Sequence, residues 1–168
     1  YWINCDRAGH GHGTQDGNLM HVQGLYAVLA TLRERYPALV IENCAAGGNR
    51  LDPGLLRYTD VAWMDDVSAP SSHVRHNIQG LSAVFPPAYL LSFVMDDPVE
   101  RIHGAADMTL YFRSRMLGAL GMSLRAEEFD DDDLEVMRRE IFLYKRTRPI
   151  LRDAVPVLLT DQVAARGA

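Results

Sequence analysis

Short apolar runs alternate with amphipathic stretches along most of this chain, and that alternation restricts its fold more than any other feature of the sequence. Four stretches place apolar side chains at helical spacing, namely residues 20–36, 72–84, 104–116 and 130–145, and residues 53–58 suit a further short helix. Four short apolar or β-branched runs lie between them, namely residues 38–43, 60–64, 88–94 and 117–124. Strands that alternate with helices in this way form a parallel sheet with crossover helices, so the sequence predicts an α/β fold.

Polar residues follow the predicted strands, and their positions help to choose between two architectures. Glu42, the pair at 65–66 and the pair at 96–97 each come where a strand ends. A doubly wound sheet and half of a (β/α)8 barrel both fit the order of elements. In the barrel, however, the carboxyl ends of all strands face one common active site. We therefore expect the C-terminal half of a (β/α)8 TIM barrel.

The two ends of the chain differ from its middle. Residues 1–4 read as the tail of a barrel strand, so we expect the chain to be a piece of a longer protein. The acidic run 130–133 suits the positive N-terminal end of a helix dipole, and Pro149 is expected to end that helix. We predict that residues 1–152 form the half-barrel and that residues 153–168 are a linker or the start of a C-terminal domain.

Composition limits the classes of partner. The formal net charge is −5 and no basic run is present, so nothing favours nucleic acid or an anionic membrane surface. No apolar stretch approaches the roughly 20 residues that span a bilayer. Cys5 and Cys44 form neither a metal-type pair nor a disulfide framework, and we predict two free thiols. The compartment is left open.

Carboxylates at strand ends are the first candidates for chemistry. Asp65 and Asp66 directly follow a strand that contains Trp63, a good platform for the apolar face of a sugar ring. Two carboxylates cleave a glycosidic bond when one protonates the leaving oxygen and the other attacks the anomeric carbon or activates water. The pair could equally cap a turn or the next helix. Glu42 is either catalytic or a buried structural carboxylate that pairs with an Arg or Lys of a neighbouring strand.

A glycine- and histidine-rich segment at residues 9–13 is the second candidate. Its His10 and His12 could suggest a metal, with three remote histidines at 73, 76 and 103. An H-x-H pair without a cysteine or carboxylate at a recognised interval is a weak metal signal, so we expect no metal, no cofactor, and a flexible loop at the barrel rim. Phosphate-binding glycine motifs and the nucleophile elbow of acyl hydrolases are missing from the sequence.

Several motifs together resemble the bacterial α-galactosidases of glycoside hydrolase family 36. Residues 42–58 contain Glu-Asn-Cys, a glycine run and Arg-Leu-Asp, and residues 63–66 read Trp-Met-Asp-Asp. The family has a strand ending in Glu-Ser-Cys, a glycine run, Arg-Phe-Asp and then Trp-x-x-Asp. Residues 118–121 and 144–149 are similar to its final barrel strand and its Tyr-Lys-x-x-Arg-Pro segment. The resemblance covers the chain from Tyr1 to about residue 152.

The resemblance implies retaining, double-displacement hydrolysis of terminal α-galactosides. By the Trp-x-x-Asp match, Asp66 corresponds to the acid/base, and Asp65 would be the neighbour that holds or tunes it. Cys44, Gly47 and Gly48 match the family's region near the sugar's 2-hydroxyl. Carbohydrate is the implied partner, and a homo-oligomer of the full-length parent is expected.

The nucleophile is the part of the family pattern that this sequence lacks. In the family it belongs to a Lys-Trp-Asp-x-Asn segment, which does not occur here. We expect it just before Tyr1, with Asp6 as the alternative, because retaining enzymes hold their two carboxylates about 5 Å apart. Asn4 would line the site. The fragment alone is therefore expected to be inactive.

Other functions remain consistent with the same residues. The chain could belong to a catalytically inactive carbohydrate-binding barrel, or to an α-N-acetylgalactosaminidase or transglycosidase on the same fold. An unrelated doubly wound ligand-binding domain could carry similar turns. In a barrel the polar strand ends would point to one side, and this would exclude the open sheet.

Overall fold

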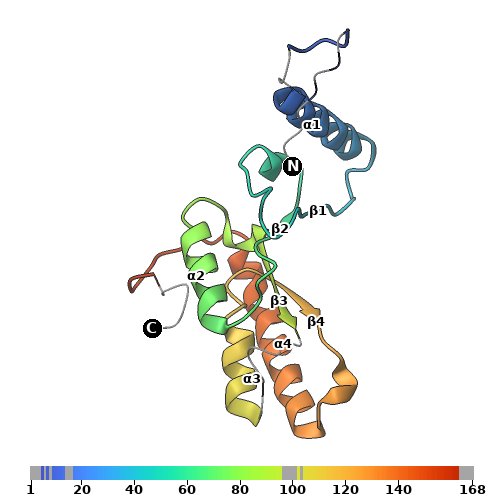
Figure 1. The fold of residues 1–168 in the computed structure, drawn as a ribbon. Helices are drawn as coiled ribbons and strands as arrows, with labels where there is room; N and C mark the ends of the chain where they lie inside the picture. Colours follow the sequence, from blue (N-terminus) through green and yellow to red (C-terminus); the bar gives the residue numbers. More distant parts are fainter. Residues whose placement is uncertain are drawn as a thin grey trace.

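The computed structural model describes residues 5, 7, 9–13, 17–95, 102 and 104–162. Its helices are α1 (Gly17–Arg35), α2 (Ser71–Leu81), α3 (Gly104–Arg113) and α4 (Asp131–Leu151) (Figure 1). Its strands are β1 (Glu42–Asn43), β2 (Val61–Trp63), β3 (Leu90–Met95) and β4 (Ala119–Ser123). Short 3-10 turns η1 (Leu55–Arg57), η2 (Pro87–Tyr89) and η3 (Ala126–Glu128) complete the order. The predicted α/β alternation is confirmed, while the strand expected at residues 1–4 lies outside the described residues.

The four strands form one parallel sheet in chain order, β1-β2-β3-β4. The register pairs Glu42 with Val61, Ala62 with Leu90, and Leu91 with Ala119. A doubly wound sheet reverses its strand order at a switch point, whereas barrel strands follow one another around the wall. The sheet therefore has the arrangement of consecutive strands of a (β/α)8 barrel.

All four strands are shorter than the runs predicted from the sequence, and β1 is shortened the most. The run 38–43 was expected to be a buried strand, but only Glu42 and Asn43 pair with a neighbour, and Val40 is 73% exposed. Within the described residues β1 has a neighbouring strand on one side only, so most of this run does not pair with another strand. The run 88–94 begins its strand at Leu90, because residues 87–89 form η2 instead.

The core consists of two apolar clusters. One includes Leu90 at the start of β3, and the other includes Val94 near its end. The first packs α2 and η2 against β2 and β3, and the second packs α3 and α4 against β3. Figure 1 shows α3 and α4 lying side by side below the sheet. Beside the first cluster, the buried hydroxyl groups of Thr59 and Tyr89 lie 2.6 Å apart and share a hydrogen bond. These clusters hold β2 and β3 in place and with them the turn that follows β2.

Helix α4 begins where its sequence predicts but ends later. The Asp130 side chain accepts a hydrogen bond from the backbone N–H of Asp133 at 2.9 Å, which caps the first turn. Pro149 was expected to stop the helix, and this is wrong, because the helix continues to Leu151. Pro149 has no N–H to donate to the carbonyl oxygen of Lys145, so the helix passes this position with one backbone hydrogen bond fewer.

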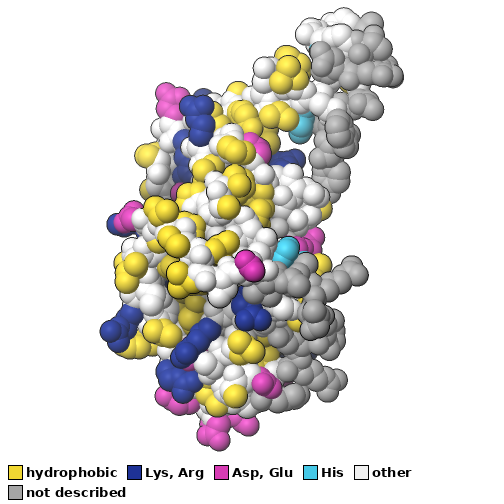
Figure 2. Space-filling view, turned by 90° about the vertical axis from the view of Figure 1, so that its left-hand side faces the viewer, with side chains coloured by type: hydrophobic (Ala, Val, Ile, Leu, Met, Phe, Trp, Pro, Cys, Tyr) yellow, Lys and Arg dark blue, Asp and Glu magenta, His cyan; other side chains and the backbone are white. Residues whose placement is uncertain are grey.

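The segment after α4 lies on the surface without a helix or strand through residue 162. Gln162 Nε2 donates to the carbonyl oxygen of His76 on α2 at 2.9 Å. Val155 and Leu159 are 85% and 92% exposed. On the face shown in Figure 2, hydrophobic side chains cover much of the middle and charged side chains gather at the lower end. The assignment of residues 153–168 to a linker or a further domain stays a prediction.

Among the helices of the described residues, none combines the length and the apolar character needed to cross a bilayer.

Candidate functional site

The glycine loop after β1 and the Asp65–Asp66 turn after β2 lie against each other at one edge of the sheet. A Cβ atom added at Gly47 would overlap the backbone nitrogen of Asp66 and lie 3.0 Å from its Cγ. One added at Gly48 would overlap the carbonyl oxygen of Met64. Both glycines have positive φ, 61° and 86°. The structure thus brings together the two segments that the sequence marked separately.

Asp65 is held on both carboxylate oxygens. Its Oδ1 accepts from the Val67 N–H at 2.9 Å, while its Oδ2 accepts from Asn77 Nδ2 at 2.8 Å and lies 2.7 Å from His73 Nε2. Burial alone would raise the pKa of Asp65, but hydrogen bonds from Val67, His73 and Asn77 and the charge of His73 outweigh it and lower that pKa. Asp65 therefore stays ionised and anchors the turn to α2.

Asp66 is exposed and has one oxygen available. Its Oδ1 accepts from the indole Nε1–H of Trp63 at 2.8 Å. Within the described residues, its Oδ2 has no hydrogen-bond partner. The Trp63 ring also packs edge-on against Phe93, with centroids 4.5 Å apart at 69°. These contacts orient both the indole and the carboxyl group while leaving an oxygen of Asp66 for a ligand.

The prediction for Cys44 is confirmed, and the one for Glu42 is not. Cys44 is exposed, and both it and Cys5 are free thiols, as predicted. Glu42 was expected to be buried; this is wrong, since it is exposed and, in the described part of the chain, has no hydrogen-bond or ion-pair partner. Among the described residues β1 pairs with β2 alone, so its other side is uncovered. The buried side chain is instead Asn43, whose Nδ2 donates to the Arg50 carbonyl at 2.5 Å.

Asp52 ties the glycine loop to α1. Its Oδ1 accepts from the Tyr26 hydroxyl at 2.8 Å and from the Gly54 N–H at 2.6 Å. Burial first, and then the neighbouring carboxylate, raise the pKa of Tyr26, so the phenol stays a donor. The loop is thereby fixed at its far end as well as against Asp66.

Two members of this arrangement were not identified as site residues from the sequence. His73 was considered only as a remote metal ligand, and Asn77 was not considered, yet both contact Asp65. Their i, i+4 spacing on α2 places them on one helix face, and this is the signal that could have paired them with the preceding turn. Asn4, Asp6 and the pair at 96–97 lie outside the described residues.

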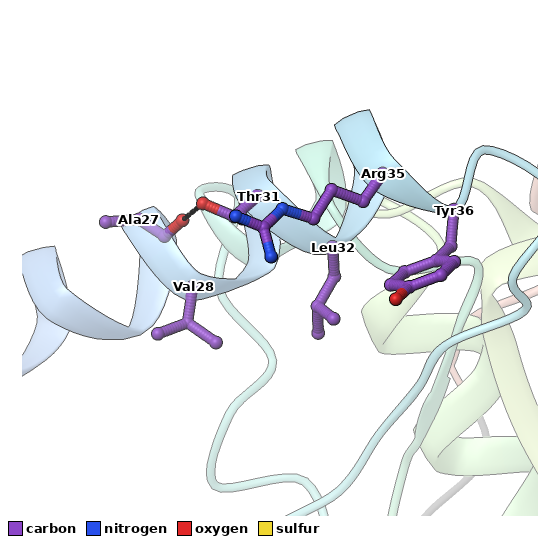
Figure 3. Close-up of a pocket in the computed structure, with 6 residues that line it drawn as sticks. All are labelled: Ala27, Val28, Thr31, Leu32, Arg35 and Tyr36. Carbon is purple, nitrogen blue, oxygen red and sulfur yellow. Dashed lines mark hydrogen bonds between the residues drawn. The ribbon is translucent and has the colours of Figure 1, made fainter.

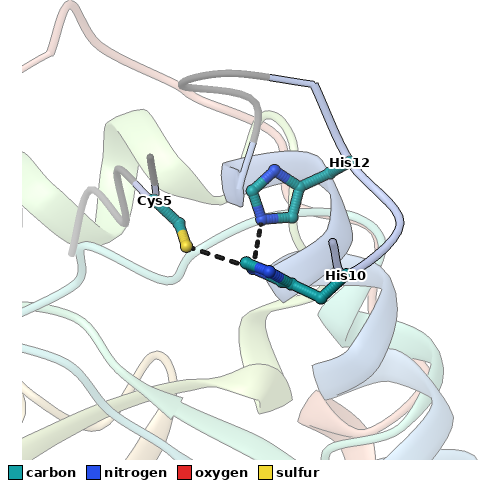
Figure 4. Close-up of side chains that lie close together, drawn as sticks. All are labelled: Cys5, His10 and His12. Carbon is teal, nitrogen blue, oxygen red and sulfur yellow. Dashed lines mark hydrogen bonds between the residues drawn. The ribbon is translucent and has the colours of Figure 1, made fainter. Parts of the chain in front are cut away.

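The N-terminal segment contains a second cluster. The ligand atoms of Cys5, His10 and His12 all lie within 4.8 Å of one another (Figure 4). The sequence showed the two histidines but not the cysteine, which precedes His10 by five positions. Reading the pattern as C-x4-H-x-H would have found it. His76 is not part of this cluster, and His103 is outside the described residues.

A shallow hollow of about 460 Å³ runs along one face of α1 and its end (Figure 3). Its lining residues are Ala27, Val28, Thr31, Leu32, Arg35 and Tyr36. It contains no carboxylate and none of the candidate site residues, so it is not the site described above.

Comparison with known proteins agrees with the motifs. The family model described as Melibiase matches residues 5–153. Alpha-galactosidase 2 of Pediococcus pentosaceus is 30% identical over 142 residues, which are 83% of this chain and 20% of that protein. Alpha-galactosidase AgaA of Geobacillus stearothermophilus is 26% identical over 132 residues, 79% of this chain and 18% of that protein. The chain thus spans about a fifth of the length of these relatives.

Solved structures show the same fold. The galactosidase domain of the alpha-galactosidase-sucrose kinase AgaSK superimposes with a TM-score of 0.80 at 23% identity, covering 90% of this chain and 21% of that one. The GH36 alpha-galactosidase AgaA of Geobacillus stearothermophilus, in a variant form complexed with stachyose, gives a TM-score of 0.75 at 25% identity, covering 88% of this chain and 20% of that one.

Proposed function

The chain belongs to the melibiase family, and from this premise we propose that it supplies part of the catalytic barrel of a retaining glycoside hydrolase that acts on terminal α-galactosides. The relatives named above are alpha-galactosidases, and one neighbour was solved with stachyose. The observation that carries the proposal is the contrast within one turn: Asp65 is held on both oxygens, whereas Asp66 is exposed and oriented by Trp63.

Asp66 is the general acid/base of this proposal. A group that protonates the glycosidic oxygen must reach the ligand, and Asp66 has an oxygen not engaged by the described residues. In the first step its proton passes to the departing oxygen, and in the second it accepts a proton from the attacking water. Asp65 cannot take this role, because its lowered pKa keeps it ionised and its oxygens already accept hydrogen bonds.

The surrounding residues bind and orient the sugar. Trp63 is only partly buried, so its indole can cover the apolar face of a pyranose ring. Gly47 and Gly48 lack side chains, which lets their loop close against the Asp65–Asp66 turn, and Cys44 of the same loop is exposed. We assign the 2-hydroxyl contact to this loop.

Double displacement needs a second carboxylate about 5 Å from the first. Asp65 is unsuited to attack an anomeric carbon because His73 and Asn77 engage its Oδ2 and the Val67 N–H engages its Oδ1. We therefore assign the nucleophile to neither member of the pair, and retain an aspartate before Tyr1, or Asp6, for this role.

The test uses Asp66→Ala in the full-length protein that carries this chain. General acid catalysis contributes about 10²–10⁴-fold, so natural α-galactosides with poor leaving groups should lose that much rate. Activated aryl α-galactosides, whose leaving groups need little protonation, should lose far less at the first step. Azide should restore part of the rate and yield an α-galactosyl azide, since a small anion can attack the glycosyl-enzyme in place of activated water.

Asp65→Ala is the matched control. Loss of the anchor should slow all substrates by a similar factor and should give no azide product. If the leaving-group dependence and the azide product follow Asp65→Ala instead, the acid/base is assigned to the wrong aspartate. If neither variant loses activity, the site itself is in the wrong place.

A further inference from the structure

Three donor atoms in the segment before α1 point at one another, and we propose that Cys5, His10 and His12 bind a divalent cation of the zinc class. Cys5 Sγ lies 3.1 Å from His10 Nε2, and His10 Nε2 lies 2.9 Å from His12 Nε2 (Figure 4). In a tetrahedral site, zinc–nitrogen bonds of about 2.0 Å and zinc–sulfur bonds of about 2.3 Å separate adjacent ligand atoms by roughly 3.5 Å. The two contacts of His10 are shorter than that spacing, and all three ligand atoms lie within 4.8 Å of one another, so small side-chain shifts would bring them to it.

A backbone contact sets the tautomer of His12. Its Nδ1 lies 2.7 Å from the carbonyl oxygen of Gly13. A carbonyl oxygen only accepts, so Nδ1 carries the proton and Nε2 of the neutral ring keeps its lone pair. Metal-binding histidines are held in the same way, with the second ring nitrogen donating to a backbone carbonyl or carboxylate. His12 Nε2 is thus prepared as a ligand atom and faces the other two.

The contacts of His10 Nε2 suit an atom that carries a proton without metal and binds the cation when metal is present. Its Nε2 meets the lone pair of His12 Nε2 on one side and Cys5 Sγ on the other. Without metal, the single Nε2–H of His10 can donate to one of these two acceptors. With metal, Nε2 of His10 and the thiolate of Cys5 are both deprotonated, so binding should release protons and strengthen as the pH rises.

The glycines on either side of His10 shape the segment for this convergence. Gly9 and Gly11 have φ of +87° and +81°, while a Cβ atom at either would meet nothing within 4 Å. Conformation, and not lack of space, is therefore why glycine suits these positions. The resulting turns bring two imidazoles that are two residues apart to a centroid distance of 4.5 Å at 89°.

The donor set selects the class of metal. One sulfur and two imidazole nitrogens suit Zn²⁺ and its substitute Co²⁺, whereas Mg²⁺ and Ca²⁺ require oxygen ligands. Three protein ligands leave a fourth coordination position, as in open zinc sites. His10 is exposed, so ions have access from solvent. This inference is independent of glycoside hydrolysis.

The test is a titration of the full 168-residue chain with Co²⁺ and then Zn²⁺ at pH 7.5, with metal carry-over removed beforehand. We expect one Co²⁺ per chain, with a thiolate-to-cobalt absorption band that Zn²⁺ abolishes by displacement. Cys5→Ser should eliminate the band. It should also weaken Zn²⁺ binding by more than the about 10–100-fold typical of losing an outer-shell partner, because a ligand itself is lost.

Cys44→Ser is the matched control, because Cys44 is the other free thiol and is exposed. It should leave the band and the affinity unchanged. Gly11→Ala retains all three donors and should weaken binding through the backbone alone, while circular dichroism verifies that each variant is folded. The proposal is overturned if the chain shows no thiolate band, or if Cys44→Ser lowers the affinity as much as Cys5→Ser; the cluster would then be only a set of hydrogen bonds.

Discussion

Helices α1 and α4 have nearly the same length, 19 and 21 residues, but they are buried to very different degrees. In α1 only Gly17 is buried, and Val28 is 58% exposed. In α4, Val136 and Met137 are buried in the cluster shared with α3, and Glu140 is fully buried. An apolar stripe is enough to predict a helix, but its contribution to stability depends on the layer that packs against it.

Both regions also contain an ion pair. Arg33 connects α1 to the sheet by donating to the Tyr58 carbonyl at 2.6 Å and pairing with Asp60. Burial alone would raise the pKa of Asp60, but the Ile41 N–H and Arg33 lower it overall. In the α3–α4 region, Arg113 of α3 donates from Nε to the fully buried Glu140 of α4 at 2.9 Å, in addition to the apolar contacts. The candidate site lies between the two regions along the chain, since the glycine loop follows β1 and the two aspartates follow β2.

The most direct test of the difference in burial between α1 and α4 removes an apolar side chain from each helix. Met137→Ala should lower the free energy of unfolding by about 2–5 kcal/mol, because it leaves a cavity in a closed cluster. Val28→Ala should change it by less than about 0.5 kcal/mol, since the side chain is mainly in solvent. Urea unfolding monitored by circular dichroism measures both. Similar losses would mean that α1 is packed as tightly as α4.

A second substitution tests the contact between the glycine loop and the Asp65–Asp66 turn. Gly47→Ala should cost about 2–3 kcal/mol, of which 1–2 come from the positive φ and the rest from overlap with the Asp66 backbone. Gly24 lies in α1, where an added Cβ meets nothing within 4 Å, so Gly24→Ala should stabilise by roughly 0.5–1 kcal/mol. The same unfolding experiment compares them. A neutral Gly47→Ala would show that the loop does not rest on Asp66.

The smallest effect concerns the two aspartates. The folded-state pKa of Asp65 is lowered, so its stabilising contribution is present above its unfolded pKa, about 4, and is lost as the pH falls through the folded value. Hydrogen bonds to a charged group are worth about 1.5–3 kcal/mol, and partial exposure reduces this, so Asp65→Asn should cost about 1 kcal/mol at pH 7.

Measuring the free energy of unfolding between pH 7 and pH 2 checks this prediction. The difference between the wild type and Asp65→Asn should shrink toward the acid end. Asp66→Asn serves as the control and should stay within about 0.5 kcal/mol throughout, since its carboxyl group is exposed. A pH-independent cost for Asp65→Asn would contradict the ionised anchor.

Much of the fold could be predicted from the sequence because its signals are local. Helical spacing, the acidic start of α4 and the short apolar runs each depend on neighbouring residues, and the described elements appear where they were expected. The errors occur where local signals compete with context. The helix continues past Pro149 to Leu151, and the apolar run at 38–43 pairs only at its end.

The sequence by itself determined which residues stand at the strand ends: Trp63, Asp65, Asp66 and the glycine loop are set by chain order alone. Only the tertiary structure decided their different environments. Asp65 meets Asn77, twelve positions away, through the packing of α2 on the sheet, and Asp66 stays exposed. Such contacts depend on how distant segments pack, so hydrogen bonding and burial could not be read from residues 65 and 66 themselves.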